Sequence, residues 1–224
     1  MTRTEFAERI SSGLAGWLQQ LAAQNLEHQV GEDAARVELV RMISAQQAYV
    51  PDTSLRPTNW PTTTKKRVDV AVLGRQKLAA GGWYGAIELK WPNSSIDVKQ
   101  TRQNIVEDAV RVAFSSTANL CANFLIIGGT ASALEKLLDK THSNAARERQ
   151  RTHFNNLFSR DMKNPNGFLS NTDLNAEFPD FGDRVPQTVF NGWTRRLRSN
   201  LVAVSEAKVG TSVKGYVYVW QIMK

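Results

Sequence analysis

Three charged residues interrupt two short apolar stretches of the chain. Asp69 lies within RVDVAVL at 67–73, and Glu88 and Lys90 lie within YGAIELKW at 84–91. Burying an unpaired charge is costly, and two carboxylates that meet repel each other unless a cation lies between them. Mg²⁺ prefers oxygen ligands of this kind. A lysine beside them could orient an attacking water, assist its deprotonation, or stabilise charge on a phosphate. The pattern therefore favours metal-assisted hydrolysis.

Strand alternation determines whether these side chains can meet. In a strand over 67–73, the alternate valines share one face and Asp69 points to the other. In a strand over 84–91, Glu88 and Lys90 are two residues apart and point to the same side. If the two strands pair as neighbours, the carboxyl groups of Asp69 and Glu88 converge. The alternative is an edge hairpin with its charges in solvent.

The order of these elements resembles that of the PD-(D/E)xK nuclease superfamily, which has the restriction-endonuclease-like fold. Asp69 precedes Glu88 by 19 residues, Lys90 completes the ExK element, and a predicted helix follows. The resemblance implies that Asp69 and Glu88 bind Mg²⁺ or Mn²⁺ and that Lys90 acts near the attacking water. It covers about residues 32–129. Val68 stands where the motif name has proline.

The resemblance also implies further site residues on the helices around the motif. The family often has a glutamate on a helix before the first motif strand. We predict Glu38 for this position, with Glu32 as the alternative. Some members place a glutamine on the helix after the ExK strand, for which we predict Gln103, with Gln100 as the alternative.

A second ExK sequence occurs at Glu206-Ala207-Lys208. It has no aspartate on a strand shortly before it and no room for a following helix. We therefore place the site at the first copy.

The rest of the chain predicts an α/β fold, with a mixed central sheet flanked by helices. We expect a single nuclease-like domain over 1–224, made of an N-terminal helix in 1–31, a core with the motif in 32–129, and a C-terminal helical and hairpin extension in 130–224. Apolar periodicity predicts helices over 4–23, 32–49, 96–116, 132–140 and 145–160, strands over 67–73, 84–91 and 123–129, and a closing hairpin over 201–210 and 214–223. The segment over 164–192 is rich in Asn, Pro, Gly and Asp, which predicts a long loop.

The net charge of +7 is unevenly distributed along the chain. Residues 1–60 carry 5 Lys and Arg against 7 Asp and Glu, and residues 61–224 carry 23 against 14. Such segregation favours a polyanionic partner, although a basic face that aids solubility is the alternative. The arginines predicted to contact nucleic acid are Arg147, Arg149, Arg151, Arg195, Arg196 and Arg198.

Composition excludes other classes of protein. No apolar stretch approaches the length of a membrane span, and the N-terminus lacks a secretory pattern. The single cysteine, Cys121, indicates a reducing, cytoplasmic compartment.

The expected function is therefore Mg²⁺-dependent cleavage of phosphodiester bonds. The resemblance implies DNA rather than RNA, in bacterial or phage restriction, defence or repair, and a homodimer would suit cleavage of both strands. One alternative is a nuclease fold that has lost catalysis and acts as a DNA-binding or assembly module. Another is a protein that binds an acidic protein partner.

Overall fold

The computed structural model describes residues 2–46, 48–54, 67–74, 83–93, 95, 97–115, 122–138, 152–170 and 196–223. Its helices are α1 (Arg3–Ala23), α2 (Glu32–Ser44), α3 (Val98–Ser115) and α4 (Ala131–Leu138), with a short 3-10 helix at Glu27–Gln29 and a helical turn over 152–157. Its strands are β1 (Tyr49–Asp52), β2 (Val70–Gly74), β3 (Trp83–Lys90), β4 (Ala122–Thr130), β5 (Asn166–Leu169), β6 (Leu197–Val209) and β7 (Ser212–Met223).

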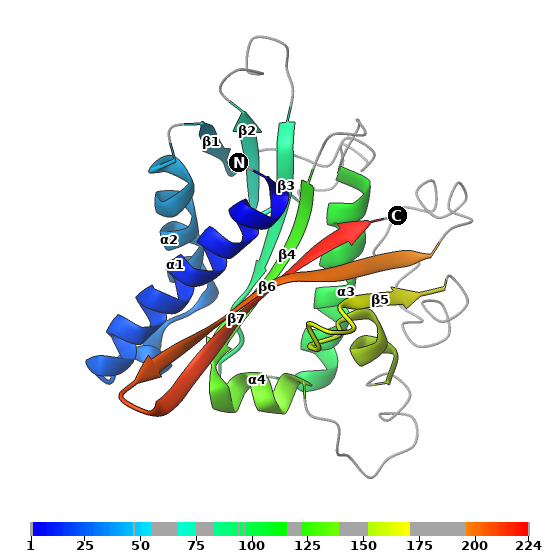
Figure 1. Ribbon diagram of the computed structural model, residues 1–224. Helices are drawn as coiled ribbons and strands as arrows, with labels where there is room; N and C mark the ends of the chain where they lie inside the picture. Colours follow the sequence, from blue (N-terminus) through cyan, green and yellow to red (C-terminus); the bar gives the residue numbers. More distant parts are fainter. Residues whose placement is uncertain are drawn as a thin grey trace.

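These seven strands form one mixed sheet in the order β1-β2-β3-β4-β7-β6-β5. β3 and β4 run parallel, and the other described pairs are antiparallel. Helices α1 and α2 cover one face of the sheet, while α3 and α4 cover the other (Figure 1). The predicted α/β class and flanked mixed sheet are therefore confirmed.

Helix α1 forms for the reasons that its sequence predicts. Thr2 accepts a hydrogen bond from the backbone of Glu5, and the Glu5 side chain accepts one from the backbone of Thr2, which closes a capping box. The apolar stripe at four-residue spacing then lies buried on the sheet. The four largest residues of this stripe are Phe6, Ile10, Leu14 and Leu18.

The structure corrects the prediction in three places. The helix predicted over 32–49 ends at Ser44, and β1 follows it with Pro51 inside. An edge strand tolerates this proline because one side of its backbone needs no ladder partner. β5 lies in the predicted loop over 164–192. The closing hairpin is part of the central sheet through the β4–β7 pair, rather than an extension from it. Residues 139–151 and 171–195 lie outside the described residues.

Gly167 allows β5 to lie close to the helical turn over 152–157. A Cβ atom at this position would overlap the backbone carbonyl oxygens of Asn156 and Leu157. We expect Gly167→Ala to lower the free energy of unfolding by about 1–3 kcal/mol, because backbone atoms cannot rotate out of the way. Urea denaturation measures this. A Cβ atom on Gly16 of α1 would meet no atom within 4 Å, so Gly16→Ala is the matched control and should stabilise the helix.

Candidate active site

Asp69 and Glu88 lie side by side where β2 begins beside β3. The strands pair Ala71 with Ala86 and Val70 with Ile87, and one further step of this register places Asp69 opposite Glu88. The backbone N–H of Leu89 donates a 2.8 Å hydrogen bond to Oδ2 of Asp69. The Asp69 side chain therefore supplies a hydrogen-bond acceptor to the backbone of β3, just beyond the last β3 residue that pairs with β2.

Glu88 and Lys90 both face α3. Glu88 is in register with Leu125, which belongs to the core beneath α3, whereas Ile87 and Leu89 belong to the core beneath α1 and α2. Oε1 of Glu88 lies 2.7 Å from Nη1 of Arg111. Nζ of Lys90 lies 2.9 Å from Oδ2 of Asp108. Both partners lie on α3, and Arg111 also contacts Asp108 directly.

Side chains from the first turns of α2, which covers the other face of the sheet, also contact Asp69 and Lys90. Nζ of Lys90 lies 3.2 Å from Oε1 of Glu32, and Nη2 of Arg36 lies 3.1 Å from Oδ1 of Asp69. Glu32 and Arg36 are one helical turn apart, so they project from one side of α2. The carboxylate cluster therefore joins α2, β2, β3 and α3, and its members are Glu32, Arg36, Asp69, Glu88, Lys90, Asp108 and Arg111.

Glu38, the helix residue predicted first, is held elsewhere. Its carboxylate accepts a 2.8 Å hydrogen bond from Nε of Arg41, whose side chain is 73% exposed. Glu32, the alternative, is the glutamate of α2 that contacts Lys90. Glu38 is six residues farther along the helix and therefore points in a different direction from Glu32.

The predicted glutamine of α3 is buried, whereas its alternative is engaged on the helix. Nε2 of Gln103 has no hydrogen-bond partner within the described part of the chain. Nε2 of Gln100 donates a 2.8 Å hydrogen bond to Asn104. Within the described residues, neither side-chain amide donates a hydrogen bond to the carboxylate cluster.

Burial is the main influence on Glu88. Its side chain is 1% exposed, and loss of hydration raises its pKa well above the ordinary value. The negative charges of Asp108 and Asp69, together with a hydrogen bond to Asp69, raise this pKa further, against the opposing effect of Arg111. The folded protein therefore shifts the protonation equilibrium of Glu88 toward the neutral acid relative to an exposed glutamate.

Lys90 stays charged despite its burial. Burial acts to lower the pKa of its ammonium group, but Asp108, Glu32 and Asp69 outweigh this effect and raise the pKa above its ordinary value. An ammonium group has no lone pair with which to accept a proton. Of the chemical roles considered for Lys90, the structure therefore favours orienting a water and stabilising negative charge over acting as a general base.

The raised pKa of Glu88 makes stability depend on pH. Because folding favours the protonated acid, the contribution of Glu88 to stability is present below the ordinary carboxyl pKa of 4.5 and is lost as pH rises through the raised value. We expect Glu88→Gln, which cannot ionise, to become more stable relative to the native chain between about pH 5 and about pH 8.

Chemical denaturation at both pH values measures this change. Glu8→Gln, on an exposed position of α1, is the matched control for loss of a surface carboxyl. A relative stability of Glu88→Gln that is unchanged, or that falls as pH rises, would contradict the prediction.

The chemistry of the cluster is compatible with a divalent metal held by two carboxylates. Asp69 and Glu88 supply oxygen ligands from adjacent strands, and Mg²⁺ commonly takes one or two carboxylates and completes its shell with water. In this structure each of the two carboxyl groups instead contacts a guanidinium group: Arg36 lies beside Asp69, and Arg111 lies beside Glu88. A metal would compete with these guanidinium groups. Within the described residues, no three His, Cys, Asp or Glu side chains form a ready-made metal site.

Sequence reasoning missed the two cluster residues on α3. Asp108 and Arg111 lie next to buried apolar residues of that helix, which include Ala109, Val110 and Val112. The charges of Asp108 and Arg111, three residues apart in a mostly apolar stretch that also contains Glu107, were the available signal, since buried charges are almost always paired. The same reasoning applied to α3 as to β3 would have found them.

The second ExK sequence has a surface role in the structure. Glu206 and Lys208 lie on β6, and their side chains pair directly with each other while remaining 42% and 50% exposed. Of the predicted nucleic-acid contacts, Arg196 and Arg198 are exposed at the start of β6. Arg147, Arg149, Arg151 and Arg195 lie outside the described residues.

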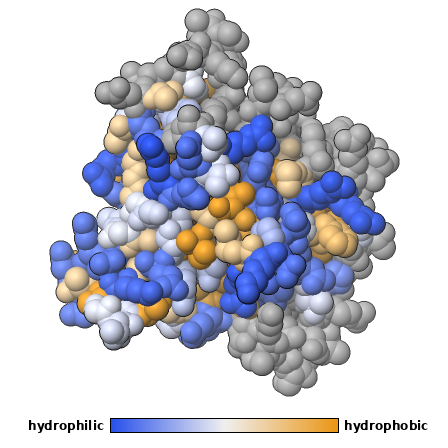
Figure 2. Space-filling view, viewed as in Figure 1, coloured by the Kyte–Doolittle hydropathy of each residue, from blue (hydrophilic) through white to orange (hydrophobic). Residues whose placement is uncertain are grey.

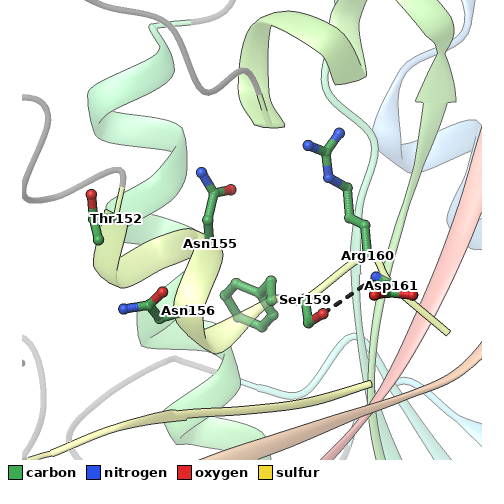
Figure 3. Close-up of a pocket in the computed structure, with 7 residues that line it drawn as sticks. Thr152, Asn155, Asn156, Ser159, Arg160 and Asp161 are labelled. Carbon is green, nitrogen blue, oxygen red and sulfur yellow. Dashed lines mark hydrogen bonds between the residues drawn. The ribbon is translucent and has the colours of Figure 1, made fainter. Parts of the chain in front are cut away.

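A separate pocket lies on the segment after α4 in the chain (Figure 3). Its single acid, Asp161, accepts hydrogen bonds from the backbone of Lys163 and the side chain of Asn164. The lining contains no predicted site residue and no pair of acids, so it does not suit the predicted metal chemistry. The lining residues are Thr152, Asn155, Asn156, Phe158, Ser159, Arg160 and Asp161.

Comparisons with known proteins give no match: no family model, no curated protein and no solved structure is similar to this chain. Among the described helices, none is long and apolar enough to cross a membrane.

Proposed function

We propose that this protein is a metal-dependent nuclease of the PD-(D/E)xK type whose active site is the carboxylate cluster. The observation that carries the proposal is the convergence of Asp69, Glu88 and Lys90 where β2 meets β3, with Glu32 in contact with Lys90. These residues come from separate parts of the sequence. Three of them are the residues that the motif selects.

The order of elements around the cluster supports the same proposal. The sequence α2, β1, β2, β3, α3, β4 places a helix before the motif strands and a helix and a strand after them. Asp69 lies immediately before β2, and the ExK element lies at the end of β3. This is the arrangement that the resemblance implies.

Each residue has a defined role in the proposed reaction. Asp69 and Glu88 would hold Mg²⁺ or Mn²⁺, which supplies an activated water and neutralises charge on the phosphate. Lys90, held as an ammonium group by Asp108 and Glu32, stabilises the negative charge that develops on the phosphate. Glu32 is 31% exposed and Glu88 is 1% exposed, so substrate approaches from the side of α2. The proposed substrate is DNA in the cytoplasm.

Incubation of the purified protein with plasmid and with single-stranded DNA tests the proposal. We expect cleavage in Mg²⁺ or Mn²⁺ and none in chelator. Absence of cleavage of either substrate in both metals would refute it.

A second candidate is a nucleic-acid-binding module without catalysis. The observation that favours it is the pairing of Arg36 with Asp69 and of Arg111 with Glu88, which satisfies the carboxylates without a metal. Such a module would bind DNA in chelator as well as in Mg²⁺. Asp69→Ala would leave its affinity unchanged or increase it, since the change removes a negative charge.

A further inference from the structure

A second surface lies on the opposite face of the sheet, at the edge formed by β5. Strand register places two rows of side chains across β5, β6 and β7 there. The first row contains Phe168, Arg198 and Met223, and the second contains Asn166, Asn200 and Gln221. We call these six residues, together with Arg196, the β5 platform.

The first row combines an exposed aromatic ring with one arginine, and Arg196 beside the row supplies a second. Phe168 is 52% exposed, although both of its neighbours in β5, Gly167 and Leu169, are buried. The guanidinium carbon of Arg196 lies 4.9 Å from the centre of the Phe168 ring, and the exposed Arg198 lies directly across from Phe168 on β6. Figure 2 shows an apolar patch beside strongly hydrophilic groups near β5.

The second row consists entirely of side-chain amides. Asn166 is exposed, while Asn200 and Gln221 are half-buried. Oδ1 of Asn200 has no hydrogen-bond partner within the described part of the chain. An amide offers both a donor and an acceptor, and a buried acceptor without a partner is costly. A ligand with mixed donor and acceptor edges would satisfy this row.

We propose that the β5 platform binds single-stranded nucleic acid. An unpaired base stacks on Phe168, its edge contacts the amides, and the phosphates lie beside Arg196 and Arg198. Aromatic stacking with cationic contacts to the backbone is the general means of binding single strands, and base edges are free for amides only when they are unpaired.

This inference goes beyond the proposed nuclease activity and does not depend on it. Gln221 is in register with Phe124, which belongs to the core beneath α1 and α2. Glu88 is in register with Leu125, in the core beneath α3. The platform and the carboxylate cluster therefore lie on opposite faces, and β4, β7 and β6 separate β3 from β5 in the sheet.

Fluorescence anisotropy in chelator, where metal-dependent cleavage cannot occur, tests the platform. The probes are labelled oligo(dT), oligo(rU) and a DNA duplex of equal length. We expect both single strands to bind more tightly than the duplex. Phe168→Ala should weaken single-strand binding about tenfold or more, since one stacked base is lost. Phe168→Leu, which keeps the apolar area but loses the ring, should also bind weakly.

Two further variants test the roles of charge and of the amide row. Arg198→Ala should reduce the dependence of log affinity on log salt by about 0.7, as expected for one lost phosphate contact to a single strand. Asn200→Ala should weaken binding at every salt concentration without changing this slope. Unfolding midpoints equal to that of the native chain show that the variants are folded.

Val204→Ala is the matched control, because Val204 is also exposed on β6 but lies outside the two rows. Binding is measured in chelator on the native chain, so the outcome does not depend on whether the carboxylate cluster is catalytic, which separates this inference from the nuclease proposal. Native affinity in Phe168→Ala, or a duplex that binds at least as tightly as the single strands, would overturn the inference. Absence of binding at low salt would also overturn it and would indicate an acidic protein partner.

Discussion

Asp69→Asn should lower the rate of metal-dependent DNA cleavage by about 100-fold or more, because a bound metal supplies several kcal/mol of charge stabilisation in the transition state. Asparagine keeps the shape of the side chain and an oxygen that can accept the hydrogen bond from the Leu89 N–H. The variant should therefore fold as the native chain does. Initial cleavage rates of plasmid in Mg²⁺ and in Mn²⁺ measure the effect.

Asp33→Asn is the matched control for this change. Asp33 pairs with Arg36, the same arginine that contacts Asp69, but its side chain is 95% exposed. Loss of its charge should leave the cleavage rate unchanged. A similar loss of rate in Asp33→Asn and Asp69→Asn would show that the rate depends on the ion pairs of Arg36. It would contradict a role for Asp69 as a metal ligand.

Arg111→Met should lower the free energy of unfolding by about 3–5 kcal/mol, the range found when one partner is removed from a buried ion pair. Arg111 is 12% exposed and contacts the carboxylates of both Glu88 and Asp108. Methionine replaces its apolar stem but removes the cation beside the buried Glu88 and one of the two cations beside Asp108, which keeps Lys90. Urea denaturation at neutral pH measures the loss.

Two comparisons make this stability prediction specific. Arg41→Met removes the arginine of another pair at three-residue spacing, but at an exposed position, where ion pairs contribute little. It should change stability much less than Arg111→Met. Adding Glu88→Gln to Arg111→Met should recover part of the loss, because the double variant no longer buries a carboxyl group at position 88. Equal effects of Arg41→Met and Arg111→Met would contradict the buried network.

Local patterns in the sequence were sufficient to predict five of the seven described strands and most of the helices, but not β1 and β5. The alternation of Val70, Ala71 and Val72 depends only on the geometry of a strand, so it indicated which way Asp69 points. The pairing of β2 with β3 was an assumption at that stage, because no local pattern specifies which strands are neighbours. The pairing of Val70 with Ile87 in the structure shows that β2 and β3 are neighbours and fixes their register.

The choice between Glu32 and Glu38 could not be made from the sequence. Both are acids of one helix, and Glu38 was preferred because it lies within the apolar VELV. The deciding fact is tertiary: the first turns of α2 lie against the cluster, where Glu32 contacts Lys90. Helix periodicity gives the relative directions of side chains but not the orientation of the helix toward its neighbours.

β5 was missed for a related reason. The four residues of this strand lie in a segment rich in Asn, Pro and Gly, which is typical of loops. The strand forms because β6 offers it an edge, with Phe168 opposite Arg198. Pairing with a long, stable hairpin outweighs the weak strand propensity of Asn166 and Gly167.

The most direct measurement of the proposed site compares the rate of metal-dependent DNA cleavage by the native protein with the rates of Lys90→Met and Lys208→Met, purified in parallel. Both lysines end an ExK sequence, but Lys90 joins the carboxylate cluster and Lys208 pairs with Glu206 on the surface. We predict that Lys90→Met loses about 100-fold in rate or more and that Lys208→Met cleaves as the native protein does. A native rate in Lys90→Met would contradict the assignment of the active site.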